Sequence, residues 1–296
     1  MAKPILTAKD FHPEVLADFD KYVHGLISRR EFINRSSKFV AGAAGATSIL
    51  ASLSPNYVQA QDIAADDVRI SSEYLVYLSP QNWQGYLVKP ANASGPLPAV
   101  LVIHENRGRN PYIEDVVRRL GVAGFMVMAP DALTSFGGWP GDDDKGREMQ
   151  SELDRDEMFA NWVAAVRYLQ NHPDSNSEVG AVGFCYGGGV VNQLAVTLPD
   201  LAAGVPYYGD QPSAEDAAKI KAPLLIHNGE LDERILAGQA AYGAALTAAG
   251  VEFEAYVYPG ANHGFHNNST PRFDEAAADL SWERTLAWFN QHLREA

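Results

Sequence analysis

The chain has 296 residues, of which 46% are hydrophobic and 20% are charged. This composition is typical of a folded globular protein and excludes a disordered or collagen-like chain. Lys and Arg number 23 against 37 Asp and Glu, which gives a formal net charge of −14. Because an acidic surface repels phosphate backbones, we expect no nucleic-acid partner. The single cysteine excludes an intrachain disulfide.

The N-terminal segment, residues 1–60, differs from the rest and has two interpretations. Ser28-Arg29-Arg30-Glu31-Phe32-Ile33 resembles a twin-arginine export signal, residues 39–61 carry no charge, and Val58-Gln59-Ala60 is a small-x-small cleavage site. This interpretation predicts cleavage and a periplasmic location. The alternative is a retained helical extension of a cytoplasmic protein, since apolar residues recur at helical spacing: Val15, Phe19, Tyr22, Val23 and Leu26. The apolar stretch of about 15 residues is too short to span a membrane, so we expect no stable membrane insertion.

Residues 61–296 alternate short apolar runs with helical patterns, which indicates a single domain. Buried strands are predicted at 98–103, 125–129, 179–183, 204–208, 223–227 and 253–258. Helices are predicted at 111–123, 154–171, 187–198, 235–249 and 274–294. Residues 68–78 and 83–89 alternate apolar and polar residues, as an antiparallel edge hairpin does. The order predicts a doubly wound, mostly parallel α/β sheet between two helical layers. The long loop at 134–148 is predicted to be a lid or binding loop.

The cysteine lies where a nucleophile is expected. Gly183-Phe184-Cys185-Tyr186-Gly187-Gly188 joins a predicted strand to a predicted helix and matches the G-x-S-x-G nucleophile elbow, with Cys in place of Ser. The start of a helix favours the thiolate, and the backbone N–H of Tyr186 is a predicted oxyanion donor. The alternative is a tight turn that holds a buried, inert cysteine.

Two further residues complete a triad in the chain order of an α/β hydrolase. Asp232 follows the strand predicted at 223–227, and His263 follows the last predicted strand. This order predicts that Cys185 is the nucleophile, that His263 is its base, and that Asp232 orients the imidazole. The alternatives are a helix N-cap for Asp232 and an ordinary loop residue for His263.

These motifs resemble the dienelactone hydrolase (carboxymethylenebutenolidase) family over residues 66–296. The resemblance rests on the cysteine elbow, on Gly229 to Asp232, on Asn262-His263-Gly264-Phe265, and on His104-Glu105-Asn106-Arg107-Gly108. It implies that Glu105 pairs with the resting thiol and that the backbone N–H of Asn106 is the second oxyanion donor. A carboxylate beside a thiol does disfavour the thiolate. The alternative for Glu105 is a salt bridge to Arg107 or Arg109.

The chain departs from that family where a substrate carboxylate would bind. The resemblance implies two arginines, one of them just after the catalytic-histidine motif, where this chain has Phe265-His266-Asn267. Weaker candidates for substrate binding are Arg107, Arg109, Trp139 and Arg272, with surface ion pairing and ordinary packing as the alternatives. An ester, a lactone or an enol-lactone is therefore favoured over dienelactone itself.

The sequence thus predicts a cysteine-dependent hydrolase that acts on a small-molecule ester or lactone through an acyl-enzyme, with no cofactor and no metal. A thioesterase or aryl-esterase is the alternative enzyme. A non-catalytic homologue that binds a ligand or senses redox state through Cys185 is the alternative from another class. The choice between monomer and homodimer stays open.

Overall fold

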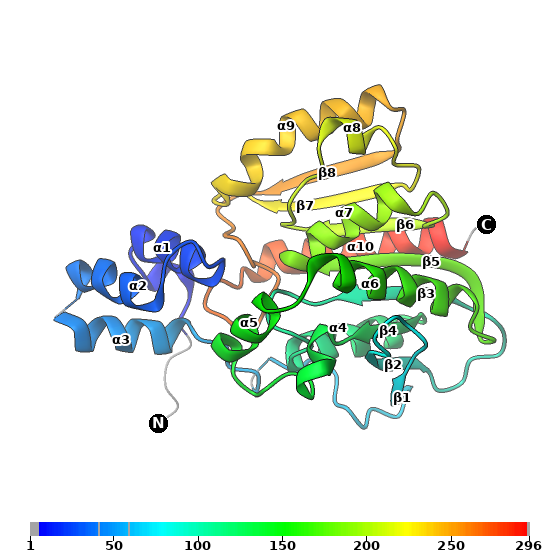
Figure 1. The fold of residues 1–296 in the computed structure, drawn as a ribbon, viewed down its shortest axis with the longest axis horizontal. Coiled ribbons are helices and arrows are strands. Elements are labelled where there is room, and N and C mark those ends of the chain that lie inside the picture. The colour runs from blue at the N-terminus through cyan, green and yellow to red at the C-terminus, as the bar shows by residue number, and fades with distance from the viewer. Residues whose placement is uncertain (1–5, 41, 59, 295–296) are drawn as a thin grey trace.

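The computed structural model describes residues 6–40, 42–58 and 60–294. It contains an N-terminal helical unit followed by an α/β domain (Figure 1). The α-helices are α1 Pro13–Val23, α2 Arg29–Ser36, α3 Gly42–Leu53, α4 Pro111–Val122, α5 Asp143–Ser151, α6 Arg155–Gln170, α7 Tyr186–Thr197, α8 Ala214–Ala217, α9 Glu233–Ala248 and α10 Glu275–Arg294. The strands are β1 Ile70–Val76, β2 Gln84–Pro90, β3 Leu97–Ile103, β4 Met126–Pro130, β5 Ser175–Phe184, β6 Ala203–Tyr207, β7 Leu224–Gly229 and β8 Phe253–Tyr258. Short 3₁₀ turns lie at Ala8–Asp10, Ser37–Phe39 and Ala132–Phe136.

The sheet has the order β1-β2-β4-β3-β5-β6-β7-β8. β1 pairs antiparallel with β2, and β2 pairs antiparallel with β4, whereas every pair from β4–β3 to β7–β8 is parallel. The strand order changes direction around β3 and β5, which is where open α/β sheets bind their ligands. The predicted doubly wound sheet with an edge hairpin is confirmed.

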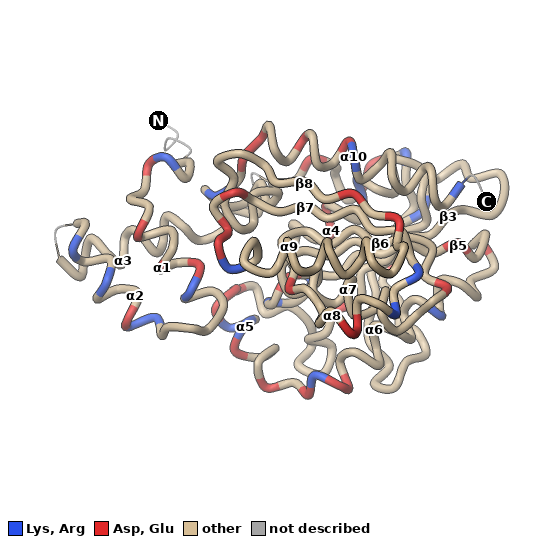
Figure 2. Tube along the Cα trace, turned by 90° about the horizontal axis from the view of Figure 1, so that it is seen from above, with Lys and Arg blue, Asp and Glu red and all other residues tan. Residues whose placement is uncertain are grey.

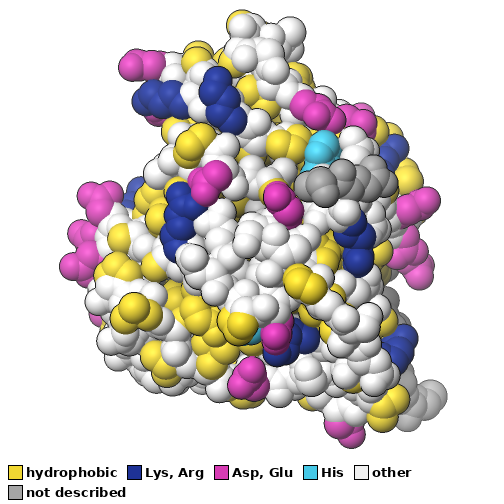
Figure 3. Space-filling view, turned by 90° about the vertical axis from the view of Figure 1, so that its right-hand side faces the viewer, with side chains coloured by type: hydrophobic (Ala, Val, Ile, Leu, Met, Phe, Trp, Pro, Cys, Tyr) yellow, Lys and Arg dark blue, Asp and Glu magenta, His cyan; other side chains and the backbone are white. Residues whose placement is uncertain are grey.

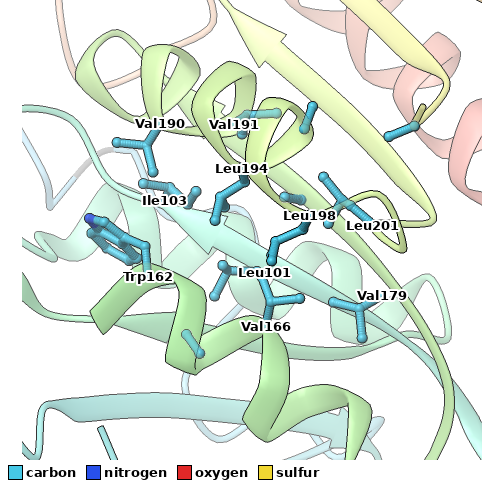
Figure 4. Packing of buried hydrophobic residues seen from close by; sticks show 14 of the residues in the cluster. Leu101, Ile103, Trp162, Val166, Val179, Val190, Val191, Leu194, Leu198 and Leu201 are labelled. Atoms are coloured by element: carbon cyan, nitrogen blue, oxygen red, sulfur yellow. The ribbon is translucent and has the colours of Figure 1, made fainter. Parts of the chain in front are cut away.

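Two apolar layers hold the helices against the sheet. One is formed under α6, α7 and α9, and the other under α4 and α10. Figure 4 shows the first layer, where Trp162 and Val166 of α6 and Leu194 of α7 pack around Leu101 of β3. All four of these side chains are fully buried. The central strands are therefore covered on both faces, which fixes the positions of the loops that leave their carboxyl ends.

The N-terminal helical unit, defined here as residues 6–54, has an apolar core of its own. Val15, Phe19 and Val23 of α1 pack with Phe32 of α2 and Leu50 of α3. The segment is helical, as the second interpretation predicts, whereas its retention in the mature protein and its location stay predictions. The prediction for Leu26 is wrong, because its side chain lies in the turn after α1 and is 64% exposed. Of the predicted cleavage site Val58-Gln59-Ala60, Gln59 lies outside the described residues.

The helical unit lies against α5, at the end of the sheet where the parallel strands terminate (Figures 1 and 2). The predicted loop 134–148 is partly helical here, because Asp142 caps α5 by accepting a hydrogen bond from Lys145 N (2.8 Å). The end of the molecule away from this unit carries acidic, basic and apolar side chains interspersed (Figure 3). Among the residues that the structure describes, no helix is both long enough and apolar enough to cross a membrane.

Candidate active site

Cys185 occupies a strained turn between β5 and α7. Its φ of 56° and ψ of −113° place a non-glycine residue in a sparsely populated region, which is characteristic of a functional site. A Cβ atom on Gly183 would overlap the carbonyl of Gly187, and a Cβ on Gly187 would overlap the carbonyl of Ile103. Both glycines are therefore required by the close approach of β5, α7 and β3, as the elbow motif predicts.

Asp232 and His263 meet as predicted from their chain order. The Nδ1–H of His263 donates to Oδ2 of Asp232 at 2.6 Å, and both side chains are buried. This bond leaves Nε2 of His263 as the free ring nitrogen, and Nε2 is a buried atom without a hydrogen-bond partner. Asp232 is also the N-cap of α9, since its Oδ1 accepts from Ile235 N at 3.3 Å. The two roles weighed for Asp232 thus occur together.

A second histidine, His24 of the N-terminal helical unit, lies on the same cysteine. Its Nε2 is 3.3 Å from Sγ of Cys185, and its ring packs edge-on against His263 with 4.7 Å between the ring centroids. Its Nδ1–H donates to the main-chain carbonyl of Asp20 at 2.7 Å, and one oxygen of the Asp20 carboxylate is 3.3 Å away. Sequence reasoning missed His24, because it is 161 residues from Cys185.

The two imidazoles determine the charge state of the thiol. Burial raises the pKa of Cys185, but the charges of His24 and His263 outweigh it and lower the pKa to about 6. In turn, burial disfavours the charged imidazoles, but the Cys185 charge outweighs it with help from Asp20 and Asp232. The pKa of His24 rises to about 9 and that of His263 to about 10. At neutral pH the site therefore holds a thiolate next to imidazolium.

The donor set of His24, Cys185 and His263 also resembles a metal site. One ligand atom from each residue lies within 4.8 Å of the other two. Sulfur with two imidazoles suits Zn²⁺, although the sequence predicts no metal. A guanidinium nitrogen of Arg234 is 3.1 Å from Nε2 of His24, so this nitrogen already has a hydrogen-bond donor beside it. The same three residues are also of the types that carry acid–base chemistry.

The predicted oxyanion donors flank the thiol. Tyr186 is the first residue of α7, so its N–H has no acceptor within the helix. Asn106 lies in the loop after β3, and its side-chain Nδ2 donates to the carbonyl of Val23 at 2.7 Å. Both residues line the cavity that contains Cys185. The loop after β3 and the start of α7 therefore border the same cavity as Cys185.

Glu105 does not face the thiol as the resemblance implies. Its carboxylate is buried, lies 3.4 Å from a guanidinium nitrogen of Arg107, and accepts from Asn267 Nδ2 at 3.1 Å. This is the salt-bridge alternative. The place beside Sγ is taken by His24, whose charge has the opposite effect on the thiol.

The weaker candidates for substrate binding do not line the cavity, because each is engaged elsewhere. Arg107 also pairs with Asp143 at 2.7 Å, and Arg109 pairs with Glu114 and donates to the carbonyl of Ala129. The ring of Trp139 packs edge-on against Tyr57. The guanidinium of Arg272 is buried, 3.6 Å from Asp20. These groups stabilise loops and the contact with the N-terminal helical unit.

The cavity above Cys185 has a volume of about 790 Å³ and lies between the N-terminal helical unit and the α/β domain. One wall is residues 22–25 and 27–29 of the unit, and another comes from α5 and α6. Apolar side chains of Met158, Phe159 and Val190 share the lining with Arg147 and Arg234. The predicted binding loop 134–148 contributes Asp144, Arg147 and Glu148, through α5. A small ester with an apolar portion fits such a mixed lining.

Comparisons with known proteins agree with this fold. Residues 83–293 match the dienelactone hydrolase family, and residues 3–42 match a family described as YqhI-like. A protein from Synechocystis named "Putative carboxymethylenebutenolidase" is 30% identical over 240 residues, which cover 74% of this chain and 97% of that protein. The "Putative hydrolase fragment YghX" of Escherichia coli K12 is 55% identical over 105 residues, covering 34% of this chain and 90% of the fragment.

The crystal structure of a "Putative Dienelactone Hydrolase" from Klebsiella pneumoniae superposes with a TM-score of 0.68 at 28% identity. The superposition covers 75% of this chain and 99% of that chain. The chain is therefore a carboxylic ester hydrolase with the α/β-hydrolase fold, and it belongs to the dienelactone hydrolase family.

Proposed function

We propose that this protein hydrolyses a small carboxylic ester, lactone or enol-lactone through a thioester on Cys185. The observation that carries the proposal is the 2.6 Å bond between Asp232 and Nδ1 of His263. The His263 ring lies beside the strained cysteine of the elbow, with a ring nitrogen within 4.8 Å of Sγ. A carboxylate-oriented histidine beside a thiol is the arrangement that nucleophilic acyl transfer requires.

Acyl transfer begins with attack of the Cys185 thiolate on the ester carbonyl carbon. The carbonyl oxygen becomes an oxyanion, held by the N–H groups of Asn106 and Tyr186. The C–O bond of the ester then breaks, and the leaving oxygen takes a proton from an imidazolium of the site, so that a thioester remains. In the second half, His263 takes a proton from water, the hydroxide attacks the thioester, and the C–S bond breaks to release the acid and regenerate the thiolate.

Activated substrates suit this site best. A thiolate with a pKa of about 6 is present at neutral pH, so attack does not wait for deprotonation. An aryl-oxide or enolate leaving group is stable as an anion and needs little help from an acid. We therefore place aryl esters and enol-lactones ahead of simple alkyl esters, and thioesters form the alternative class for the same reason.

The experiment compares the wild-type protein, Cys185→Ala and His263→Ala on p-nitrophenyl acetate, a simple lactone and an acyl thioester. The matched control is His172→Ala, a histidine outside the cavity in the turn after α6. Turnover by the wild type and the control that is abolished by Cys185→Ala supports the proposal. Acid quenching during turnover should trap an acyl adduct on Cys185, seen as a mass increase of the intact chain.

Two results would contradict the proposal. Equal turnover by wild type and Cys185→Ala would show that Cys185 is not the nucleophile. If every ester, lactone and thioester is left intact while Cys185 is oxidised and reduced reversibly, the redox-sensing alternative replaces hydrolysis. The chain offers a clean readout for this, because Cys185 is its single cysteine.

A further inference from the structure

Residues that flank His24 in the sequence connect the N-terminal helical unit to the active site through polar contacts. Val23 accepts a hydrogen bond from Asn106 in the predicted oxyanion loop (2.7 Å). The Tyr22 hydroxyl donates to Asp144 of α5 at 2.6 Å, and Arg29 pairs with the same carboxylate at 2.6 Å. The turn between α1 and α2 is thus held at the cavity from both the β3 loop and α5.

His24 is itself fixed within this turn. It follows the last residue of α1, and the next residue, Gly25, has a φ of 72° that a side chain would disfavour. The carbonyl and carboxylate of Asp20, one helical turn earlier, both face Nδ1. Because a carbonyl oxygen only accepts, Nδ1 carries a hydrogen and Nε2 is the atom presented to Cys185.

The pair Asp20–His24 repeats the pair Asp232–His263 on the other side of the sulfur. In each pair a carboxylate faces Nδ1, and in each pair Nε2 is the ring nitrogen left to face the thiol. The two rings are in edge-on contact, and each has a ring nitrogen within 4.8 Å of the sulfur. Two imidazoles therefore lie next to one thiol. Each is oriented by a carboxylate, and the two come from opposite ends of the chain.

The other charged groups around this pair have identifiable partners. In its neutral form, Nε2 of His24 accepts a hydrogen bond from Arg234 of α9 at 3.1 Å, and Arg234 also pairs with Asp210 at 2.7 Å. Arg272, 3.6 Å from Asp20, faces the carboxylate behind His24. The Tyr208 ring is tilted against His263, and its phenol is neutral because burial raises its pKa. Guanidinium groups do not lose their proton in proteins, so the groups that titrate at the thiol are the two imidazoles.

We propose that His24 is a second catalytic histidine, which holds Cys185 as a thiolate and gives its proton to the leaving group, while His263 activates water. This assignment rests on the proposed hydrolysis. The dienelactone hydrolase match begins at residue 83, so His24 lies outside it. The N-terminal helical unit is then part of the enzyme's active site rather than an appendage.

The protons balance over one reaction cycle when His24 and His263 act in this way. In the resting site the thiol proton resides on Nε2 of His24. Acylation removes the charge on sulfur, which is the strongest attraction raising the pKa of His24, so His24 releases its proton to the departing oxygen. Loss of that charge also removes the strongest attraction raising the pKa of His263, which gives its Nε2 proton to solvent and can then take a proton from water. The hydroxide attacks the thioester, the acid and the thiolate are released, and His24 regains a proton from solvent, so that the thiolate–imidazolium pair is restored.

The test measures the thiolate directly and needs no substrate. The pH dependence of alkylation of Cys185 by iodoacetamide is compared in full-length wild type, His24→Gln and Asp20→Asn. The matched control is Leu26→Ala, an exposed side chain in the same turn. Loss of a cation next to a thiol raises its pKa by about 1–3 units, so alkylation at pH 6 should fall at least about fivefold in His24→Gln. Asp20→Asn should shift the profile less, and Leu26→Ala not at all.

Imidazole rescue separates a chemical role from a structural one. In His24→Gly, added imidazole should restore both the low thiolate pKa and the rate of acyl-enzyme formation. Thermal unfolding of each variant checks that the helical unit stays folded. Profiles of His24→Gln and His24→Gly that overlay the wild type would overturn the proposal. Failure of hydrolysis is distinguishable, because it would leave the alkylation shift intact while no variant turns over an ester.

Discussion

The Asp232 carboxylate makes two hydrogen bonds in this structure, and substitutions can separate their effects. Its Oδ1 caps α9, while its Oδ2 accepts from Nδ1 of His263. Asparagine caps a helix about as well as aspartate, so Asp232→Asn should keep the cap. When the asparagine oxygen keeps the cap, its amide nitrogen takes the place of Oδ2 and brings an N–H toward Nδ1. This removes the acceptor for the imidazole proton and places that proton on Nε2. Asp232→Ala removes both functions.

The sizes of the two losses follow from the contacts. A hydrogen bond to a charged group is worth about 1.5–3 kcal/mol, which corresponds to a roughly 10- to 150-fold loss in kcat for a bond needed in the transition state. The wrong tautomer adds to this, so Asp232→Asn should lose about 100-fold or more. Loss of an N-cap costs about 0.5–2 kcal/mol of stability. Asp232→Ala should therefore be as inactive as Asp232→Asn and about 1 kcal/mol less stable.

The assay combines hydrolysis of an aryl ester with urea unfolding of each variant. The matched control is Asp154, which caps α6 through hydrogen bonds from Asp156 N and Glu157 N and lies outside the cavity. Asp154→Ala should lose stability and keep activity, and Asp154→Asn should lose neither. If Asp232→Asn keeps the wild-type kcat, then Asp232 does not orient a catalytic histidine and acts only as the N-cap of α9.

Three further outcomes follow from the same geometry. Because Cys185 has a pKa of about 6 and the thiolate is the deprotonated form, its alkylation rate should be half-maximal near pH 6 and fall severalfold by pH 5; a midpoint near 9 would contradict this. Gly187→Ala places a methyl group against the Ile103 carbonyl and should lower the free energy of unfolding by about 1–3 kcal/mol, measured in urea; an unchanged value would contradict the elbow geometry. Asp144→Asn weakens the exposed ion pair with Arg29 and should lower the free energy of unfolding by at most about 1 kcal/mol. Amide hydrogen exchange in α1 and α2 should nevertheless become faster, because this carboxylate binds the N-terminal helical unit to α5. Unchanged exchange would show that other contacts keep the unit in place.

Local patterns were sufficient to predict the α/β domain. The run 98–103 coincides with β3, because a strand buried on both faces is a continuous apolar segment in the sequence. The run 253–258 coincides with β8, but its predicted burial is wrong, because β8 is an edge strand whose residues are mostly exposed or half-buried. The elbow at Cys185 was predictable because its glycines are demanded by backbone contacts that any such turn makes. Asp232 and His263 were found because chain order along a parallel sheet implies that their loops share one edge.

The rest of the site depends on contacts that no local pattern encodes. His24 reaches Cys185 across 161 residues, and the Ala- and Gly-rich segment that follows it suits both an export signal and helix α3. Glu105 could be placed in the correct loop, but whether it faces the thiol or Arg107 is decided by side-chain packing. Helix α5 had a local signal, namely Asp142 with two more acidic residues in the first turn, and that signal competed with the glycine-rich loop before it.

Export remains a prediction, and the site gives it a chemical consequence. A chain cut after Ala60 would keep Cys185, Asp232 and His263 but lose His24 and one wall of the cavity. Since the charge of His24 is a major cause of the low thiol pKa, the cut form would hold more neutral thiol and less thiolate at neutral pH. A neutral thiol resists oxidation better, which suits an oxidising compartment. The uncut form has the more reactive thiolate and a cavity with the N-terminal helical unit as one wall. The two interpretations of residues 1–60 therefore predict two active sites that differ in the pKa of the Cys185 thiol. A measurement of this pKa in the mature protein distinguishes them.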